Sequence, residues 1–113
     1  MVQCRNIRAY KHYFSDFMES VDSDVRLKVA YVLDMLRIQQ RLNNKFVKYI
    51  RDGLFELRVE CRSNIYRVFF IFDEGNLVIL FNGFQKKTQK TPEQEIKVAL
   101  KLKKEYYETK RGQ

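Results

Sequence analysis

The chain has 113 residues, with 22 lysines and arginines against 14 aspartates and glutamates, which gives a formal net charge of +8. This length fits one domain with a real core and excludes a cofactor domain paired with a separate substrate domain. With 45% hydrophobic and 14% aromatic residues the composition argues against disorder, and the positive charge indicates a polyanionic partner: nucleic acid, an acidic protein, or both.

The cysteine and histidine content is low. Cys4, Cys61 and the single His12 are too few and too far apart for a structural zinc site. No apolar run approaches the roughly 20 residues that span a bilayer, and the amino terminus lacks a signal-peptide pattern. A secreted disulfide has no support in this pattern. The sequence therefore predicts a reduced, cytosolic chain without a cofactor or a membrane segment.

The first half of the chain is expected to be mostly helical. Residues 2–8 favour a short strand, and residues 10–21 carry apolar side chains at helical spacing. Asp22 or Ser23 can cap a second helix, which is expected to end near Arg41 because a loop signal follows it. The apolar face of that helix consists of Val25, Val29, Val32, Leu33 and Leu36.

The apolar period then changes from 3.6 to 2, which indicates strands. Residues 55–62 alternate apolar and charged side chains and predict a half-buried strand, whereas residues 65–72 are nearly all apolar and predict a central strand. Residues 77–82 predict a third strand. Two-residue turns at Ser63-Asn64 and Glu74-Gly75 are expected to join the three strands into an antiparallel meander.

A last helix is predicted from Thr91-Pro92 to about Tyr107, with threonine as its cap and proline in its first turn. The element order is then β-α-α-β-β-β-α. It predicts an α+β fold in which an antiparallel sheet, the meander plus an amino-terminal strand, packs on an amino-terminal helical hairpin and carries a carboxy-terminal helix. No linker or repeat interrupts residues 1–113, so a single domain is expected.

The expected turns set the register of the sheet. They place Glu60 opposite Arg67 and Arg67 opposite Asn82, as a polar row across the strands. One face is then expected against the first two helices, with Phe55, Leu57, Val59, Cys61, Tyr66, Val68, Phe70, Phe72, Ile79 and Phe81. The other face is expected partly beneath the last helix, with Ile65, Phe69, Ile71, Val78 and Leu80.

An arginine inside an apolar central strand is costly unless it is paired or functional, so Arg67 marks a candidate site. Arg58 lies diagonal to it, and the loop after the third strand adds lysines at the same end of the sheet. Residues 84–113 carry nine lysines and arginines against four acids, a net +5 of the total +8. The further cations are Lys86, Lys87, Lys90, Lys97, Lys101 and Lys104, with Lys45 and Lys48 before the meander.

Plainer interpretations of these residues stay open at this point. Glu60 can neutralise Arg67 as a cross-strand ion pair, and residues 86–90 can be a solvated loop. A charged stripe on a helix is usually its solvated face. Tyr106 and Tyr107 can stack on a nucleic-acid base, although packing into the core explains Tyr107 better.

Three blocks of the sequence resemble the HigB-like, phage-derived branch of the RelE/ParE toxin superfamily. They are Gly-Leu-Phe-Glu-Leu-Arg at 53–58, Ile-Tyr-Arg-Val at 65–68, and Phe-Asn-Gly-Phe-Gln-Lys-Lys-Thr-Gln-Lys-Thr-Pro at 81–92. The resemblance covers nearly the whole chain. It implies a RelE-like fold and the toxin of a bacterial type II toxin–antitoxin pair. The implied partners are a small helix-turn-helix antitoxin, messenger RNA on the ribosome and, for the complex, operator DNA.

The resemblance also implies an activity. RelE and HigB relatives cut messenger RNA without a metal, by attack of a ribose 2′-hydroxyl on the adjacent phosphate. Some HigB relatives use histidine, but this sequence has none in its sheet or carboxy-terminal region, so basic residues must act instead. The expected catalytic residues are Arg67, Arg58, Lys86, Lys87 and Glu60, and the expected RNA-binding residues are Lys90, Lys97, Lys101, Lys45, Lys48 and Tyr106.

Within that set, Arg67 is expected to clamp the scissile phosphate with help from Arg58, and Lys86 or Lys87 to stabilise charge or act as the base. Glu60 is expected to orient Arg67 or to act as the base. Two alternatives share the fold or the charge: a ParE-like inhibitor of DNA gyrase, and a nucleic-acid-binding module without catalysis.

Overall fold

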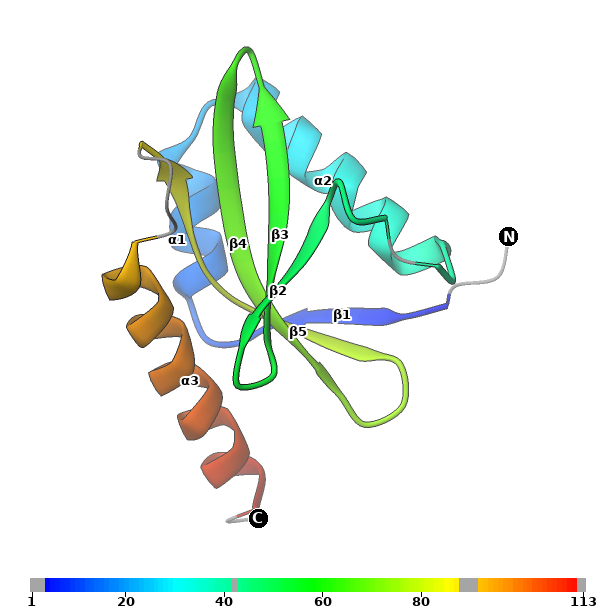
Figure 1. Cartoon of the computed structure of the whole chain (residues 1–113), viewed down its shortest axis with the longest axis vertical. Coiled ribbons are helices and arrows are strands. Elements are labelled where there is room, and N and C mark those ends of the chain that lie inside the picture. Colours follow the sequence, from blue (N-terminus) through cyan, green and yellow to red (C-terminus); the bar gives the residue numbers. More distant parts are fainter. Residues whose placement is uncertain (1–3, 42, 88–91, 112–113) are drawn as a thin grey trace.

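The computed structural model describes residues 4–41, 43–87 and 92–111, and its strands form one five-stranded sheet with helices on both faces (Figure 1). The strand order is β1-β5-β4-β3-β2, with β1 parallel to β5 and the other neighbours antiparallel. The predicted α+β class is confirmed. None of the helices within these ranges is long and apolar enough to cross a membrane. The elements are β1 (Asn6–Ala9), α1 (Tyr13–Ser20), α2 (Ser23–Ile38), β2 (Val47–Arg51), β3 (Leu54–Cys61), β4 (Asn64–Asp73), β5 (Leu77–Lys86) and α3 (Glu93–Arg111).

Strand β2 is absent from the sequence prediction. It forms a hairpin with β3, in which Arg51 pairs with Leu54 across a two-residue turn. The turn residues Asp52 and Gly53 have φ angles of 52° and 79°, and Asp-Gly is favoured where both central residues need a positive φ. This dipeptide was therefore the available signal for an additional strand at the edge of the sheet.

The register between β3 and β4 differs from the prediction by two residues. The turn residues are Arg62 and Ser63, with φ angles of 51° and 69°, rather than Ser63 and Asn64. Arg67 consequently lies opposite Arg58, and Glu60 lies opposite Ile65. The predicted Glu60–Arg67 pair is therefore wrong. A shift of two residues keeps every side chain on its predicted face, because strand side chains alternate with period two.

The register between β4 and β5 differs by one residue, and this changes the faces. The turn has three residues, 74–76, with Gly75 at φ 66°, so that Asp73 pairs with Leu77. The predicted facing of four β5 residues is therefore wrong. Val78 and Leu80 pack in the core beneath α1 and α2, whereas Ile79 and Phe81 pack in the core beneath α3.

A bulge in β5 alters the register again. Val68 pairs with Gly83 but Phe70 with Leu80, so β5 contains one extra residue at this point. Beyond the bulge Arg67 lies opposite Phe84, and the predicted Arg67–Asn82 pair is also wrong. The Asn82 side-chain amide instead donates to the main-chain oxygen and the carboxylate of Glu95 in α3, at 3.2 and 3.1 Å.

Two apolar cores lie on opposite faces of the sheet. On one face α1 lies over β5 and α2 over β3, and the five predicted core residues of α2 are all buried. Asp22 caps α2 by accepting a hydrogen bond from the Val25 amide at 3.1 Å. On the other face α3, at the lower left in Figure 1, packs against β4 and β5 and buries Ile96, Ala99 and Leu102 against Leu54, Phe69, Ile71, Ile79 and Phe81.

Gly83 lies in close contact with α1, and this yields a testable prediction. A Cβ at this position would lie 2.7 Å from Cγ and 2.8 Å from Cδ2 of Phe17. Because the ring is packed in the core, Gly83→Ala is expected to lower the free energy of unfolding by roughly 1–3 kcal/mol in urea denaturation. Adding Phe17→Leu should recover part of that loss, and full wild-type stability in Gly83→Ala would contradict the contact.

Candidate nucleic-acid interface

The sheet face that carries α3 also carries a cluster of charged residues. Strand alternation and the observed register bring them to this face: Lys48 lies opposite Glu56, Arg58 opposite Arg67, and Lys86 opposite Ile65. The core beneath α3 involves other residues of the face, so the charged cluster lies beside that core rather than within it.

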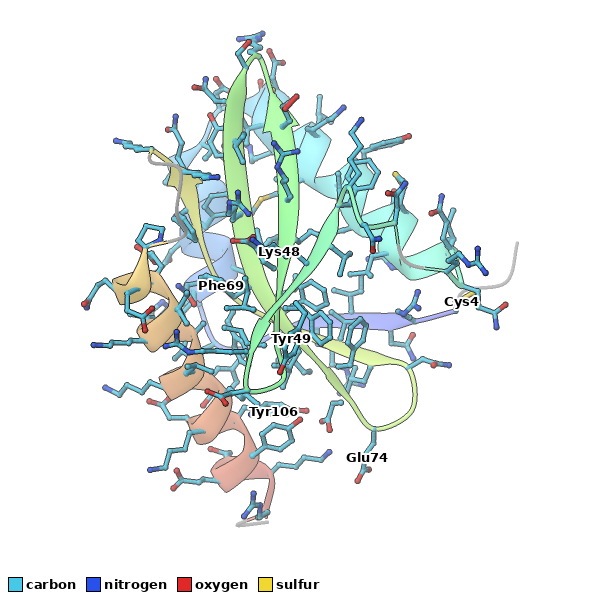
Figure 2. The ribbon with its side chains drawn as sticks, viewed as in Figure 1. Cys4, Lys48, Tyr49, Phe69, Glu74 and Tyr106 are labelled. Carbon is cyan, nitrogen blue, oxygen red and sulfur yellow. The ribbon has the colours of Figure 1, made fainter. Side chains whose placement is uncertain are left out.

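A cleft of about 410 Å³ opens at this cluster between β2 and the strands beside it. Figure 2 shows Lys48 and Tyr49 on β2, with Phe69 of the α3 core close to Lys48 in the view. Four of the seven lining residues are cations and none is an acid, so the cleft is suited to an anion. We call it the cationic cleft; it is lined by Asn44, Lys45, Val47, Lys48, Tyr49, Arg58 and Arg67.

Arg67 and Glu56 form a buried ion pair at the cleft. The side chains are 7% and 0% exposed, and the Arg67 guanidinium donates to the Glu56 carboxylate. The Arg67 Nε–H has no acceptor among the residues that the structure describes. Glu60, the partner expected from sequence, is instead a largely exposed residue whose carboxylate lies 3.7 Å from the Arg58 guanidinium.

Lys86 lies within electrostatic reach of the same cations. Partial burial lowers the pKa of its ammonium group, and the positive charges of Arg67, Arg58 and Lys48 lower it further against the opposing effect of Glu56. Its neutral amine is therefore more accessible near neutral pH than that of an ordinary lysine.

This lowered pKa can be tested by removing one of its causes. Lys48→Ala is expected to raise the pKa of Lys86 towards the ordinary value of 10.5, because one repelling charge is lost. The measurement is a pH titration of the lysine side-chain signals by NMR. Lys28→Ala, on the exposed surface of α2, should leave the Lys86 titration unchanged. An unchanged Lys86 pKa in Lys48→Ala would show that the two side chains do not interact.

The remaining predicted lysines that the structure describes do not line the cleft. Lys87 is exposed and directly follows β5, whereas Lys90 lies outside the described residues. Lys97 and Lys101 are exposed on α3 and do not line the cleft. The cleft thus contains the predicted Arg58, Arg67, Lys45 and Lys48. Lys86 does not line it, but lies near enough for the charges of Arg58, Arg67 and Lys48 to lower its pKa.

Tyr106 lies elsewhere, near the carboxy-terminal end of α3 and away from Lys48 (Figure 2). Its hydroxyl donates to the Asp73 carboxylate, which also accepts from the Lys110 ammonium at 2.9 Å. Burial and the bond to Asp73 raise the pKa of Tyr106 to about 12. In this position the side chain ties α3 to the end of β4.

The contribution of the Tyr106–Asp73 pair to folding stability depends on pH. Burial alone would raise the pKa of Asp73, but the bonds from Lys110, Tyr106 and the Glu74 amide outweigh it and leave the pKa below 3.8. The stability that ionised Asp73 contributes is complete above its unfolded pKa of 3.8. It is lost as the pH falls through the lower pKa of the folded state. The Tyr106 contribution is complete below pH 10.0 and is lost as the pH rises through about 12.

Tyr106→Phe is therefore expected to lower the free energy of unfolding at pH 7 by about 1.5 kcal/mol, since it removes a hydrogen bond to a charged group. In urea denaturation the difference from wild type should shrink once the pH is low enough to protonate Asp73. A difference that stays constant across the acid range would contradict the role of Asp73 as acceptor.

Sequence reasoning missed two residues of this region. Glu56 is fully buried, yet it occupies a charged position of an alternating strand and was not among the predicted site residues. Tyr49 belongs to the missed strand β2, for which the Asp-Gly turn was the only local signal. Neither the burial of Glu56 nor its pairing with Arg67 has a signal in the sequence pattern, because both depend on the register.

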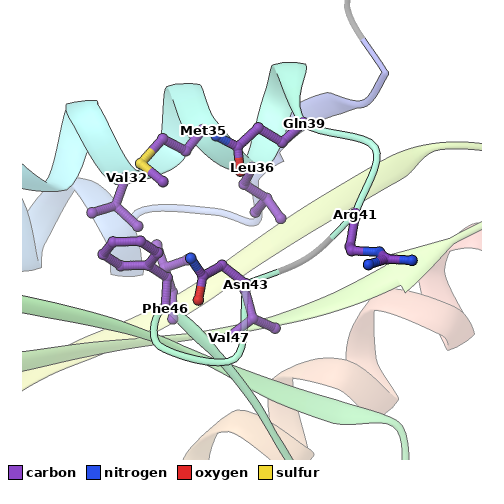
Figure 3. A pocket seen from close by; sticks show the side chains of 9 residues that line it. Val32, Met35, Leu36, Gln39, Arg41, Asn43, Phe46 and Val47 are labelled. Atoms are coloured by element: carbon purple, nitrogen blue, oxygen red, sulfur yellow. The ribbon is translucent and has the colours of Figure 1, made fainter.

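Two other hollows are less suited to a polyanion. The pocket in Figure 3, between α2 and the segment before β2, has about 10 Å³ of open space, room for about one water, and an apolar wall that includes Val32, Leu36 and Phe46. A groove of about 450 Å³ beside α2 is lined by two acids and two bases, so its charges balance. Its lining residues are Asp24, Leu27, Lys28, Tyr31, Glu60, Cys61 and Arg62.

Comparison with known protein families identifies one match. The model of the family described as phage-derived protein Gp49-like (DUF891) matches residues 16–104, which include part of α1, all of α2, every strand except β1, and about two thirds of α3. No curated protein matches the chain. The matched segment includes all residues that line the cationic cleft. The chain therefore belongs to the phage-derived Gp49-like family, which is related to the RelE/HigB toxins, and this membership indicates the toxin of a toxin–antitoxin pair with an antitoxin as its partner.

Proposed function

We propose that this protein is a ribosome-dependent messenger RNA endonuclease of the HigB type, which inhibits translation. The family supports a toxin, and the cationic cleft supports a polyanionic substrate. The observation that carries the proposal is Arg67, a buried arginine held by Glu56 in a cleft that three further cations line. A structural arginine needs only its partner, whereas a phosphate-binding arginine needs this additional positive surface.

The residues divide into three roles in this proposal. Arg67 binds the scissile phosphate and stabilises its charge in the transition state, with Arg58 assisting. Lys86, whose pKa is lowered, accepts the proton of the ribose 2′-hydroxyl, while Lys87 faces the developing charge. Glu60 holds Arg58. Lys45 and Lys48 in the cleft, together with Lys97 and Lys101 on α3 and with Lys90, bind the RNA backbone.

The chemical step needs no group beyond the RNA and the side chains. The 2′-oxygen attacks phosphorus as Lys86 takes its proton, the bond from phosphorus to the 5′-oxygen breaks, and the leaving oxygen takes a proton from the Lys87 ammonium. The products are a 2′,3′-cyclic phosphate and a 5′-hydroxyl end. Most of the rate then comes from holding the 2′-oxygen in line and from preorganised cations at the phosphate.

The test is a cleavage assay with purified protein and ribosomes programmed with a defined messenger RNA. We expect cuts within the message, with the end groups named above, and slower cutting in Lys87→Ala and Arg58→Ala. Lys28→Ala on the far face is the matched control. Wild-type rates in both Lys87→Ala and Arg58→Ala would overturn the site assignment.

Two further measurements separate the alternatives that share this fold and charge. DNA breaks on induction, without loss of intact messages, would indicate gyrase poisoning. Salt-sensitive RNA binding without cleavage on programmed ribosomes would indicate a binding module. We also propose that the antitoxin is a helix-turn-helix protein and that the complex binds operator DNA, which a gel-shift assay with the co-expressed pair tests.

A further inference from the structure

The buried carboxylate of Glu56 is the strongest unexplained feature of the molecule. It lies on β3 with an exposure of 0%, two residues from Arg58, whose side chain is 34% exposed. Burying a carboxylate costs several kcal/mol unless a partner and hydrogen bonds compensate. Arg67 supplies that partner from the neighbouring strand β4. It lies two residues before Phe69, the residue that pairs directly with Glu56.

Stability by itself does not explain this pair. A buried ion pair is often no more stabilising than two apolar residues of similar volume, because desolvation of both charges offsets their attraction. On the side of the α3 core the pair borders apolar rings: Phe69 is fully buried, and Phe84, opposite Arg67, lies 5.6 Å from it between ring centroids in a tilted arrangement. An apolar pair would therefore suit this part of the sheet as well.

The cations around Glu56 indicate what the carboxylate does. Arg67 lies directly opposite Arg58, and like charges in opposite positions repel. Without a nearby carboxylate, the Arg67 guanidinium would be expelled from the cluster of Arg58, Lys48 and Lys86 towards solvent. The Glu56 carboxylate holds one terminal nitrogen of Arg67 and leaves its other donors available, among them an Nε–H with no acceptor in the described part of the chain.

We infer that Glu56 is a positioning residue that fixes the Arg67 guanidinium for a phosphate in the cationic cleft. The inference deepens the proposed function and rests on it for its catalytic consequence. The role that the sequence assigned to Glu60 belongs to Glu56, which contacts Arg67 and not the RNA.

Glu56→Gln tests the inference because it keeps the shape and one oxygen acceptor but removes the charge. We expect kcat on programmed ribosomes to fall by about 10–100-fold with little change in KM, since a misplaced catalytic group costs on that order. The melting temperature should also fall, because the buried Arg67 loses its charged partner, so the rates are compared at a temperature where both proteins are folded. In an Arg67→Lys background, where the guanidinium is already absent, Glu56→Gln should add less than about a twofold loss. Glu108→Gln, exposed on α3, is the matched control.

Additive losses in the double variant would overturn the inference, because they would mean that Glu56 acts on the reaction independently of Arg67. A second measurement does not depend on cleavage at all. The Arg67 Nε–H signal in NMR should exchange slowly with water in the wild type and faster in Glu56→Gln. Unchanged exchange would overturn the positioning role, whereas a wild-type protein that never cleaves RNA would overturn the proposed function alone.

Discussion

Arg67→Lys is expected to lower cleavage of messenger RNA by about 10²–10³-fold, the typical cost of losing one preorganised donor in a transition state. Lysine keeps a positive charge for Glu56, so the buried carboxylate stays paired and the protein folds. It loses the planar fork of donors that matches a phosphate. The measurement is the single-turnover rate on programmed ribosomes, with far-ultraviolet circular dichroism as the check on folding.

Arg62→Lys is the matched control for this substitution. Arg62 is an exposed arginine in the β3–β4 turn that also pairs with an acid, Asp24, but lies outside the cationic cleft. Its replacement should leave the rate unchanged. Equal rates for both variants would remove Arg67 from the reaction and leave it a structural residue.

Phe69→Ala is expected to lower the free energy of unfolding by about 3–5 kcal/mol. Phe69 is fully buried in the centre of the sheet, where it contributes to the core beneath α3 and packs near Phe84. The substitution removes a whole ring from a site that strands enclose on both sides, so the cavity cannot close fully. Urea denaturation at pH 7 measures the loss.

Phe69→Leu separates the cavity from the change in chemistry. Leucine fills much of the same volume, so the loss should stay below about 1.5 kcal/mol. Because Phe69 lies opposite Glu56 in the register, Phe69→Ala should also loosen the Arg67–Glu56 pair and slow cleavage at temperatures where the protein remains folded. A stability loss as small for alanine as for leucine would mean that the site collapses around the missing ring.

The local pattern was informative wherever one periodicity held. The buried face of α2 follows from apolar residues at helical spacing, and the Asp22 cap follows from its side-chain oxygen. The proximity of Arg58 to Arg67 could also be anticipated, since both were expected on neighbouring strands, whereas Lys45 and Lys48 join them only through strand β2, which the pattern did not predict. For these features the sequence contains the physical cause itself.

The register could not be read in the same way. Arg62 and Ser63 adopt a positive φ although neither is a glycine, so the true turn had no local signal and the pairing shifted by two residues. The longer turn at Gly75 and the bulge at residues 81–82 changed which β5 side chains face α3. Turn geometry and bulges depend on packing between segments that are distant in the sequence. The periodicity of apolar residues carries no information about that packing.

The sequence by itself determined the α+β class, the positive charge and the set of cations from which a phosphate site could be built. Only the tertiary structure decided which acid pairs with Arg67. Glu60 and Glu56 are equivalent in a strand that alternates charged and apolar residues, yet one is exposed and the other is fully buried against Arg67. The physical reason is that burial depends on what covers a face and pairing on the register, and both arise only when the strands come together.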